Sequence, residues 1–225
     1  MIIAIDGPVA AGKTTLSNHL ADRLGYSLLD TGAIYRAVAL ASRRQSIGWS
    51  DEPSVAAVAS QLRIEFRWID GTNHVLLGGE DASDAIRTPE MSQGASLVSA
   101  LPAVRAALLD LQRQLGEQGD VIAEGRDIGT VVFPHADLKV FLTARPEIRA
   151  QRRHEEWLRT GIDDTYENVL EALRERDARD ENRPVAPLVP APDSILIDSS
   201  ELSIEQVVTQ VLELAGRVRA GDVSG

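Results

Sequence analysis

The sequence predicts an α/β fold: a three-layer core around a parallel sheet, with an inserted subdomain that carries a small antiparallel sheet. Short apolar runs rich in β-branched residues alternate with longer helical patterns, which is typical of a parallel sheet buried on both faces. One stretch instead alternates apolar and polar residues, as the strands of a hairpin do. A length of 225 residues is long for one simple domain and leaves room for such an insertion.

The core is expected to contain strands and helices in turn. The runs predicted as strands are Ile2 to Asp6, Tyr26 to Leu29, Val121 to Ala123, Lys139 to Leu142 and Ser194 to Ile197. The helical patterns cover Lys13 to Leu24 (ended by Gly25), Ala33 to Arg44, Glu147 to Thr160, Tyr166 to Asn182 and Ile204 to Arg219. This alternation predicts helices on both faces of the sheet.

The inserted subdomain is predicted from a hairpin pattern. Leu62 to Trp68 alternates in polarity, Asp70-Gly71 marks a turn, and Val75 to Leu77 is the returning strand. Helical segments are expected on either side, over Pro53 to Gln61 and Pro89 to Leu115. The expected division is therefore a core of residues 1–36 and 119–219, an insert of residues 37–118 and a disordered tail of residues 220–225.

Composition limits the classes of partner. The formal net charge is -11 and the chain has no cysteine. An acidic surface repels polyanions, so stable binding to nucleic acid or to an anionic membrane is not expected. Neither a disulfide framework nor a thiolate metal site is available. The chain shows no signal-peptide pattern or membrane span, and we expect a cytoplasmic protein.

A complete phosphate-binding motif follows the first strand. Residues 7–14 match G-x-x-x-x-G-K-[ST], between a buried-type strand and a helix. Backbone N–H groups and the helix N-terminus would cradle the phosphates of ATP. Lys13 would reach the β- and γ-phosphates, and the Thr14 hydroxyl would ligate Mg²⁺. The expected ATP phosphate-binding residues are Gly7, Pro8, Val9, Ala10, Ala11, Gly12, Lys13, Thr14 and Thr15. The alternative is a glycine turn that merely starts a helix.

Two polar clusters lie just after predicted strands, where open α/β sheets bind their ligands. The first is Asp30-Thr31-Gly32-Ala33-Ile34-Tyr35-Arg36, although Asp30 or Thr31 could simply cap a helix. The second is Glu124-Gly125-Arg126-Asp127-Ile128-Gly129-Thr130, where a surface Arg–Asp pair is the alternative. Glu124 also occupies the place of a strand-end acid that could support the Mg²⁺ shell. Together the clusters point to an anionic acceptor near Asp30, Thr31 and Tyr35.

A third cluster predicts a lid over the triphosphate, within residues 160–190. Arg176, Arg179 and Arg183 are spaced i, i+3, i+7 and would share one helical face. The proline-rich segment 184–190 that follows cannot continue a helix and is expected to be a stiff loop. Arg152, Arg153 and Arg179 are expected on the ATP side of this lid. The alternative is a solvated, salt-bridged helix face.

Several segments together resemble bacterial-type cytidylate kinase, in the nucleoside monophosphate kinase family. They are GPVAAGKTT at 7–15, LLDTGAIYRA at 28–37, IRTPEMSQGASLVSALPAVR at 86–105, EGRDIGTVVFPHADLKVFLTA at 124–144, RDARDENRPVAPLVPAPDS at 176–194 and DSSELSIEQV at 198–207. The resemblance implies a five-stranded parallel core of the P-loop kinase type, a nucleotide-binding insert with an antiparallel sheet, and a lid. The departures are mild: Thr31 stands where some members have serine, and Glu124 where some have aspartate.

The resemblance also implies roles for single residues. Arg36, Arg126 and Arg183 would grip the 5′-phosphate of the acceptor. Ser96, Arg105 and Asp127 would read the cytosine edge, and Arg176 with Asp180 would hold the ribose. The catalytic residues would then be Lys13, Arg126, Arg176 and Arg183. The expected reaction is Mg²⁺-dependent transfer of the γ-phosphate of ATP to CMP or dCMP, with UMP a weaker acceptor, by a monomer.

The residue types fit this chemistry, because phosphoryl transfer needs positioning and charge neutralisation more than covalent work. The acceptor phosphate is itself the nucleophile, so no general base is required. A regulatory GTPase is disfavoured because neither Lys13 nor Lys139 follows an asparagine, as the guanine-reading Asn-Lys-x-Asp requires. Two alternatives stay open: a P-loop kinase for another acceptor such as shikimate, and a nucleotide-dependent switch or scaffold without turnover.

Overall fold

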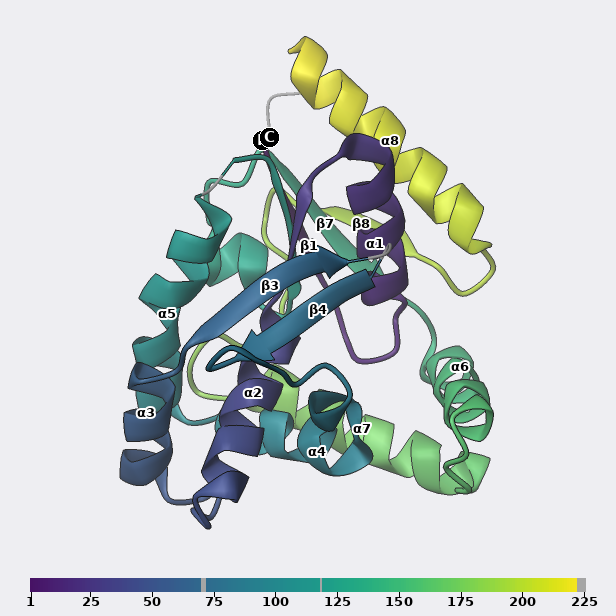
Figure 1. Cartoon of the computed structure of the whole chain (residues 1–225). Helices are drawn as coiled ribbons and strands as arrows, with labels where there is room; N and C mark the ends of the chain where they lie inside the picture. Colours follow the sequence, from purple (N-terminus) through teal and green to yellow (C-terminus); the bar gives the residue numbers. More distant parts are fainter. Residues whose placement is uncertain (70–71, 118, 222–225) are drawn as a thin grey trace.

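The computed structural model describes residues 1–69, 72–117 and 119–221, and its central sheet has five parallel strands (Figure 1). They are β1 (Ile2–Asp6), β2 (Ser27–Asp30), β6 (Val121–Gly125), β7 (Leu138–Thr143) and β8 (Ile195–Asp198). Their order is β2-β6-β1-β7-β8, and every neighbouring pair is parallel. The predicted parallel sheet is therefore confirmed, with some strand ends shifted.

Helices cover both faces of this sheet, as predicted. α1 (Lys13–Leu24) and α8 (Ile204–Ala220) pack on one face, where Ile3 and Ile5 point. α2 (Thr31–Arg44) and α5 (Pro102–Gly116) pack on the other, where Ala4 points. Side chains alternate along a strand, so β1 contributes to both cores. Figure 1 shows α1 and α8 on the opposite side of the sheet from α5.

Two further helices pack against the phosphate-binding turn. α6 (Pro146–Arg159) and α7 (Tyr166–Asn182) enclose a small core of Ala150, Val169 and Leu173. Val9 and Ala10 of the turn pack against that core. The region predicted as a lid is thus in direct contact with the phosphate-binding loop of residues 7–14, the P-loop.

The predicted hairpin is confirmed between α2 and α5. It consists of β3 (Ile64–Ile69) and β4 (Thr72–Leu77), and the short β5 (Glu80–Asp81) extends it. The predicted turn Asp70-Gly71 lies outside the described residues. α3 (Glu52–Ser60) precedes the hairpin, and a 3₁₀ turn (Ala85–Arg87) and α4 (Pro89–Val98) follow it. Its inner side chains join the core beneath α2, so hairpin and sheet share one hydrophobic core.

The helical segment predicted over Pro89 to Leu115 is wrong as one element. It is two helices, α4 and α5, with a bend of 101° between them. Pro102 is the physical reason, because its ring disfavours helical backbone at Leu101, which is extended (φ −82°, ψ 117°). Within the described ranges no single helix is long and apolar enough to cross a membrane, and only this bent pair passes that test jointly.

The end of the chain is ordered further than predicted. α8 continues through Ala220, and Gly221 closes it in the left-handed conformation. The rest of the predicted tail, residues 222–225, lies outside the described residues.

Candidate active site

The P-loop joins β1 to α1 in a conformation that depends on glycine. Gly7 has φ +149°, and a Cβ there would stand 1.9 Å from the carbonyl oxygen of Leu142. Gly12 has φ +96° immediately before α1. Side chains at either position would strain the turn or collide with β7. The local sequence therefore places a ring of backbone groups at the helix N-terminus, as an anion site requires.

Lys13 lies buried inside this loop. Its Nζ donates to the carbonyl oxygens of Gly7 at 2.8 Å and Pro8 at 2.7 Å. Burial lowers the pKa of Lys13 well below its usual value, and the nearby Arg126 guanidinium adds to this, while Glu124 opposes it. A phosphate bound in the loop would place a negative charge beside the Lys13 ammonium and so favour its charged form.

Glu124, the next-to-last residue of β6, is a buried carboxylate with unsatisfied oxygens. Neither Oε1 nor Oε2 has a partner at full hydrogen-bond geometry among the described residues, although the nearby Thr14 hydroxyl partly lowers the pKa of Glu124. Burial raises the pKa of Glu124 to about 7, and the charge of Asp30 acts in the same direction. A buried carboxylate without donors is costly unless a cation joins it. Oxygen ligands suit Mg²⁺, so Glu124 and the Thr14 hydroxyl, which line the same cleft, fit a magnesium site.

One cleft of about 850 Å³ joins these groups to the predicted acceptor side. Of the predicted site residues, it is lined by Val9, Ala10, Ala11, Gly12, Lys13, Thr14, Thr15, Asp30, Arg36, Glu124, Arg126, Arg152, Arg153 and Arg176. Thr72, Arg87 and Ser92 also line it, from the segment that follows the hairpin turn. Sequence reasoning assigned no role to these three: Arg87 and Ser92 lie within the resembling segment 86–105, and Thr72 lies in no motif.

The acceptor-side arginines are each held by a carboxylate. Arg36 Nη2 lies 2.7 Å from Asp30 Oδ2, and Arg126 Nε lies 2.9 Å from Asp180 Oδ2. Arg176 Nη1 donates to Ser92 Oγ at 2.9 Å and its Nε lies 3.9 Å from Asp180. Burial lowers the pKa of Arg176 to about 9, and Arg126 adds its repulsion. The cluster has more positive charge than its carboxylates balance.

The predicted base-reading residues form a buried network of their own. Asp127 pairs with Arg105 through one carboxylate oxygen and with Arg183 through the other, the latter at 3.2 Å. Arg105 also lies over the Tyr35 ring, 5.6 Å from its centroid. The Tyr35 hydroxyl is buried and has no partner in the described chain, and burial raises its pKa. The charged groups of this network are thus paired with one another.

Several predicted residues lie outside the cleft lining. Ser96, Arg105, Asp127, Asp180 and Arg183 are almost fully buried. Thr31 is both a site neighbour and a structural residue, since its hydroxyl donates to the Glu124 carbonyl oxygen at 2.8 Å. Asp30 does cap α2, accepting from the Ala33 N–H, and it also holds Arg36. Asp30 is therefore a helix cap, as the alternative held, and its place near the acceptor stays a prediction.

The shared helical face predicted for Arg176, Arg179 and Arg183 is wrong at its end. α7 ends at Asn182, and Arg183 has extended backbone (φ −63°, ψ 141°) that turns it toward Asp127. Pro184 is the reason, because the residue before a proline avoids helical backbone. Arg179 Nε donates to Ser96 Oγ at 3.3 Å, next to the base network.

The arginines predicted on the ATP side have structural partners. Arg152 donates to Ser199 through both the hydroxyl and the carbonyl oxygen, the latter at 2.7 Å. Arg153 pairs with Glu156 at 3.1 Å and lies over the Trp157 ring. Both reach the cleft beyond the P-loop, whereas Arg179 does not.

Arg149 is a buried residue at this site that the sequence did not reveal. Its guanidinium donates to the Ala144 carbonyl oxygen at 2.8 Å, to the Val9 carbonyl oxygen at 3.2 Å and to Asp177 Oδ2 at 2.7 Å. It thereby ties the P-loop to α7. Nothing in its local sequence distinguishes it from the other arginines of α6.

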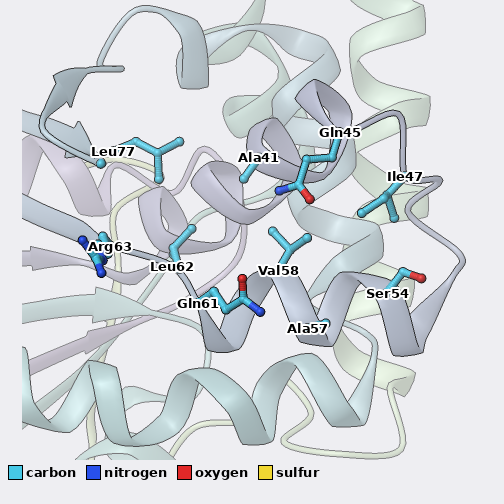
Figure 2. Close-up of a pocket in the computed structure, with 11 residues that line it drawn as sticks. Ala41, Gln45, Ile47, Ser54, Ala57, Val58, Gln61, Leu62, Arg63 and Leu77 are labelled. Atoms are coloured by element: carbon cyan, nitrogen blue, oxygen red, sulfur yellow. The ribbon is translucent and has the colours of Figure 1, made fainter.

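A separate hollow of about 480 Å³ lies between α2, α3 and the start of the hairpin (Figure 2). Gln45, Gln61 and Leu62 are among its lining residues. It contains none of the predicted site residues, so the chemistry belongs to the cleft at the P-loop.

Comparison with known proteins identifies the family. The sequence profile described as cytidylate kinase matches residues 3–217. The chain belongs to the cytidylate kinase family. It is 50% identical over 214 residues to a cytidylate kinase of Syntrophotalea carbinolica, covering 95% of this chain and 91% of that protein. It is 46% identical to that of Azotobacter vinelandii, covering 98% of both.

Solved structures support the fold alone. The chain resembles an uncharacterized protein from Eubacterium ventriosum, with a TM-score of 0.52 at 11% identity, covering 95% of this chain and 97% of that one. Within the cytidylate kinase family, a complete P-loop and an arginine cluster at one sheet edge are the parts that phosphoryl transfer between two nucleotides needs.

Proposed function

We propose that this kinase transfers the γ-phosphate of ATP to CMP or dCMP, giving ADP and CDP or dCDP, with UMP a weaker acceptor. The observation that carries the proposal is that the P-loop and three arginines, Arg36, Arg126 and Arg176, line one cleft. Two polyanionic substrates can therefore meet at a single positive site in an otherwise acidic protein.

On the donor side, the P-loop backbone and Lys13 would hold the ATP phosphates. Thr14 and Glu124 would hold Mg²⁺, which would supply positive charge to neutralise the phosphates. Arg152 and Arg153 would lie toward the nucleoside end of ATP, since they line the cleft beyond the P-loop.

On the acceptor side, Arg36, Arg126 and Arg183 would bind the 5′-phosphate and orient one of its oxygens in line with the γ-phosphate. Arg176 and Asp180 would hold the ribose, and Ser96, Arg105 and Asp127 would read cytosine. Asp127 can accept from the exocyclic amine of cytosine even while paired, because each carboxylate oxygen has two lone pairs. The carbonyl of uracil at that place would be repelled.

The division of labour along the chain follows from these roles. Residues 37–118 would form the acceptor-binding subdomain, and residues 160–190 would close over the triphosphate and exclude water. Contact of α6 and α7 with Val9 and Ala10 would transmit P-loop occupancy to the lid. We also expect the protein to act as a monomer in the cytoplasm.

The test is a coupled ADP-release assay with ATP and Mg²⁺ against CMP, dCMP, UMP, AMP, GMP and shikimate. Fast turnover on CMP and dCMP, with UMP far behind, is the expected result. Fast turnover on another acceptor would retain a kinase but overturn the cytosine pocket. Thermal stabilisation by ATP without transfer to any acceptor would support a switch or scaffold instead.

A further inference from the structure

Asp6 is a buried carboxylate that the phosphoryl-transfer scheme above does not use. It ends β1, directly before Gly7, and is only 5% exposed. Its two oxygens accept from two successive backbone N–H groups, those of Ile128 and Gly129, each at 2.8 Å. Burial raises the pKa of Asp6 to about 6, although the two N–H groups oppose the shift.

The two N–H groups belong to an unusual turn. Residues Ile128–Val132 form a single π-helical turn, a conformation that is rare and concentrated at functional sites. Arg126 and Asp127 come immediately before this turn, in the same loop that leaves β6. The carboxylate of Asp6 therefore fixes the C-terminal side of the segment that carries one acceptor-phosphate arginine and the base-reading acid.

Close packing shows that this arrangement is built tightly. A Cβ on Gly129 would stand 3.1 Å from the Lys139 stem and 3.4 Å from Asp6 Oδ2. Lys139 is itself fixed, because its Nζ donates to Pro134 O at 2.7 Å and to Asp193 at 2.6 Å. The turn is thus in close contact with the Asp6 carboxylate, and a side chain at position 129 would press on the Lys139 stem.

The P-loop has supports that do not involve Asp6. Lys13 binds the carbonyl oxygens of Gly7 and Pro8, and Arg149 binds that of Val9. Removing the Asp6 carboxylate should therefore loosen the Arg126-Asp127 loop more than the ATP cradle.

We propose that Asp6 is a positioning residue that holds the Arg126-Asp127 loop in register with the P-loop strand, so that acceptor and donor phosphates meet in line. The proposal rests on the acceptor role proposed above for Arg126 and Asp127. Asp6 acts through the backbone of Ile128 and Gly129 and touches neither substrate.

The main test is Asp6→Asn, which keeps the side-chain shape but puts an amide NH₂ against one of the two N–H groups. The matched control is Asp137→Asn: Asp137 accepts from the Ile2 N–H at 2.6 Å, the same kind of bond at the far end of β1. In Asp6→Asn, kcat/KM for CMP should fall by about tenfold or more, as expected for loss of a charge-assisted bond. The Kd for ADP should change less than twofold, and Asp137→Asn should leave both constants unchanged.

A second variant covers the case in which Asp6→Asn does not fold. Gly129→Ala would place a Cβ 3.1 Å from the fixed Lys139 stem, so it should shift the turn relative to Asp6 by a few tenths of an ångström and lower kcat/KM for CMP in the same way. Its control is Gly216→Ala in α8, where a Cβ would meet nothing within 4 Å. Combining Asp6→Asn with Arg126→Ala should cost less than the sum of the two single losses, because both act on the same contact.

Additive losses, equal losses in ADP affinity and in CMP turnover, or an unchanged kcat/KM in folded Asp6→Asn would overturn the proposal. Amide hydrogen exchange separates this outcome from a failure of the proposed function. If the wild-type protein turns over no CMP, the proposed acceptor is wrong. Faster exchange at Ile128, Gly129 and the preceding loop in Asp6→Asn, but not in Asp137→Asn, would still support the positioning role, and unchanged exchange there would refute it.

Discussion

The substitution Asp127→Asn should change which pyrimidine the enzyme prefers. The carboxylate can accept from the exocyclic amine of cytosine, whereas an amide NH₂ at the same place can donate to the carbonyl of uracil. Loss of one charge-assisted hydrogen bond corresponds to about 1.5–3 kcal/mol. We therefore expect kcat/KM for CMP to fall by about 10- to 150-fold, and that for UMP to stay level or rise.

The same substitution should also lower stability, because Asp127 is the shared partner of two buried guanidiniums. The side chains of Arg105 and Arg183 are 7% and 3% exposed, and that of Asp127 is 7% exposed. Breaking a buried pair by removing one charge costs about 3–5 kcal/mol. Asparagine retains one acceptor oxygen, so the lower part of that range is expected. Urea unfolding measures this loss separately from the kinetics.

The assay is steady-state kinetics on CMP and UMP with saturating ATP, under conditions where unfolding curves show the variant folded. Arg183→Ala is the comparison, because loss of a phosphate-binding arginine should lower turnover on both nucleotides alike. Equal losses on CMP and UMP for Asp127→Asn would refute the base-reading role. A change in preference for Arg183→Ala would show that the roles are assigned to the wrong side chains.

Three further perturbations test the donor side. The raised pKa of Glu124 means that the fold favours its protonated form. The contribution of Glu124 to stability is therefore full below about pH 4.5 and is lost as the pH rises through about 7. The free energy of unfolding, measured with urea in the presence of EDTA, should fall by up to about 3 kcal/mol between pH 5 and pH 8, and by less in Glu124→Gln. Equal falls in both proteins would contradict this. Gly7→Ala should abolish ATP binding or folding, measured by ADP titration and circular dichroism, since its Cβ would stand 1.9 Å from Leu142 O. Arg149→Ala should cost about 3–5 kcal/mol by leaving Asp177 buried and unpaired, and Arg149→Met with Asp177→Leu should recover part of this; no recovery would show that the carbonyl contacts dominate.

Local patterns were sufficient to predict most of the fold. The apolar run of β1, the glycines of the P-loop and the alternation in β3 each reflect forces acting within a few residues. Errors arose where a single proline decided the outcome. Pro102 divides the segment Pro89 to Leu115 into two helices, and Pro184 gives Arg183 an extended backbone. Both prolines were visible in the sequence, and the rule that the residue before proline avoids helix would have placed both breaks.

The partners of the site residues were much less predictable. Arg149 with Asp177, Asp6 with the turn at Ile128, and Asp127 with Arg105 join segments that are distant along the chain. No spacing rule connects them, because their proximity is created by the order of the strands. A charged residue at the end of an apolar strand, as Asp6 and Glu124 are, is the local sign that could have indicated such a role.

The arginine–carboxylate pairs explain how an acidic protein keeps a positive site ready for anions. Arg36 is held by Asp30, Arg126 by Asp180 and Arg105 by Asp127, so each guanidinium has a partner before any nucleotide arrives. An isolated buried charge would be costly, and pairing avoids that cost. An acceptor phosphate can then share or replace carboxylate oxygens with little further desolvation, because the arginines are already positioned. A molecule without a phosphate offers no such exchange, and this favours nucleotides over nucleosides as acceptors.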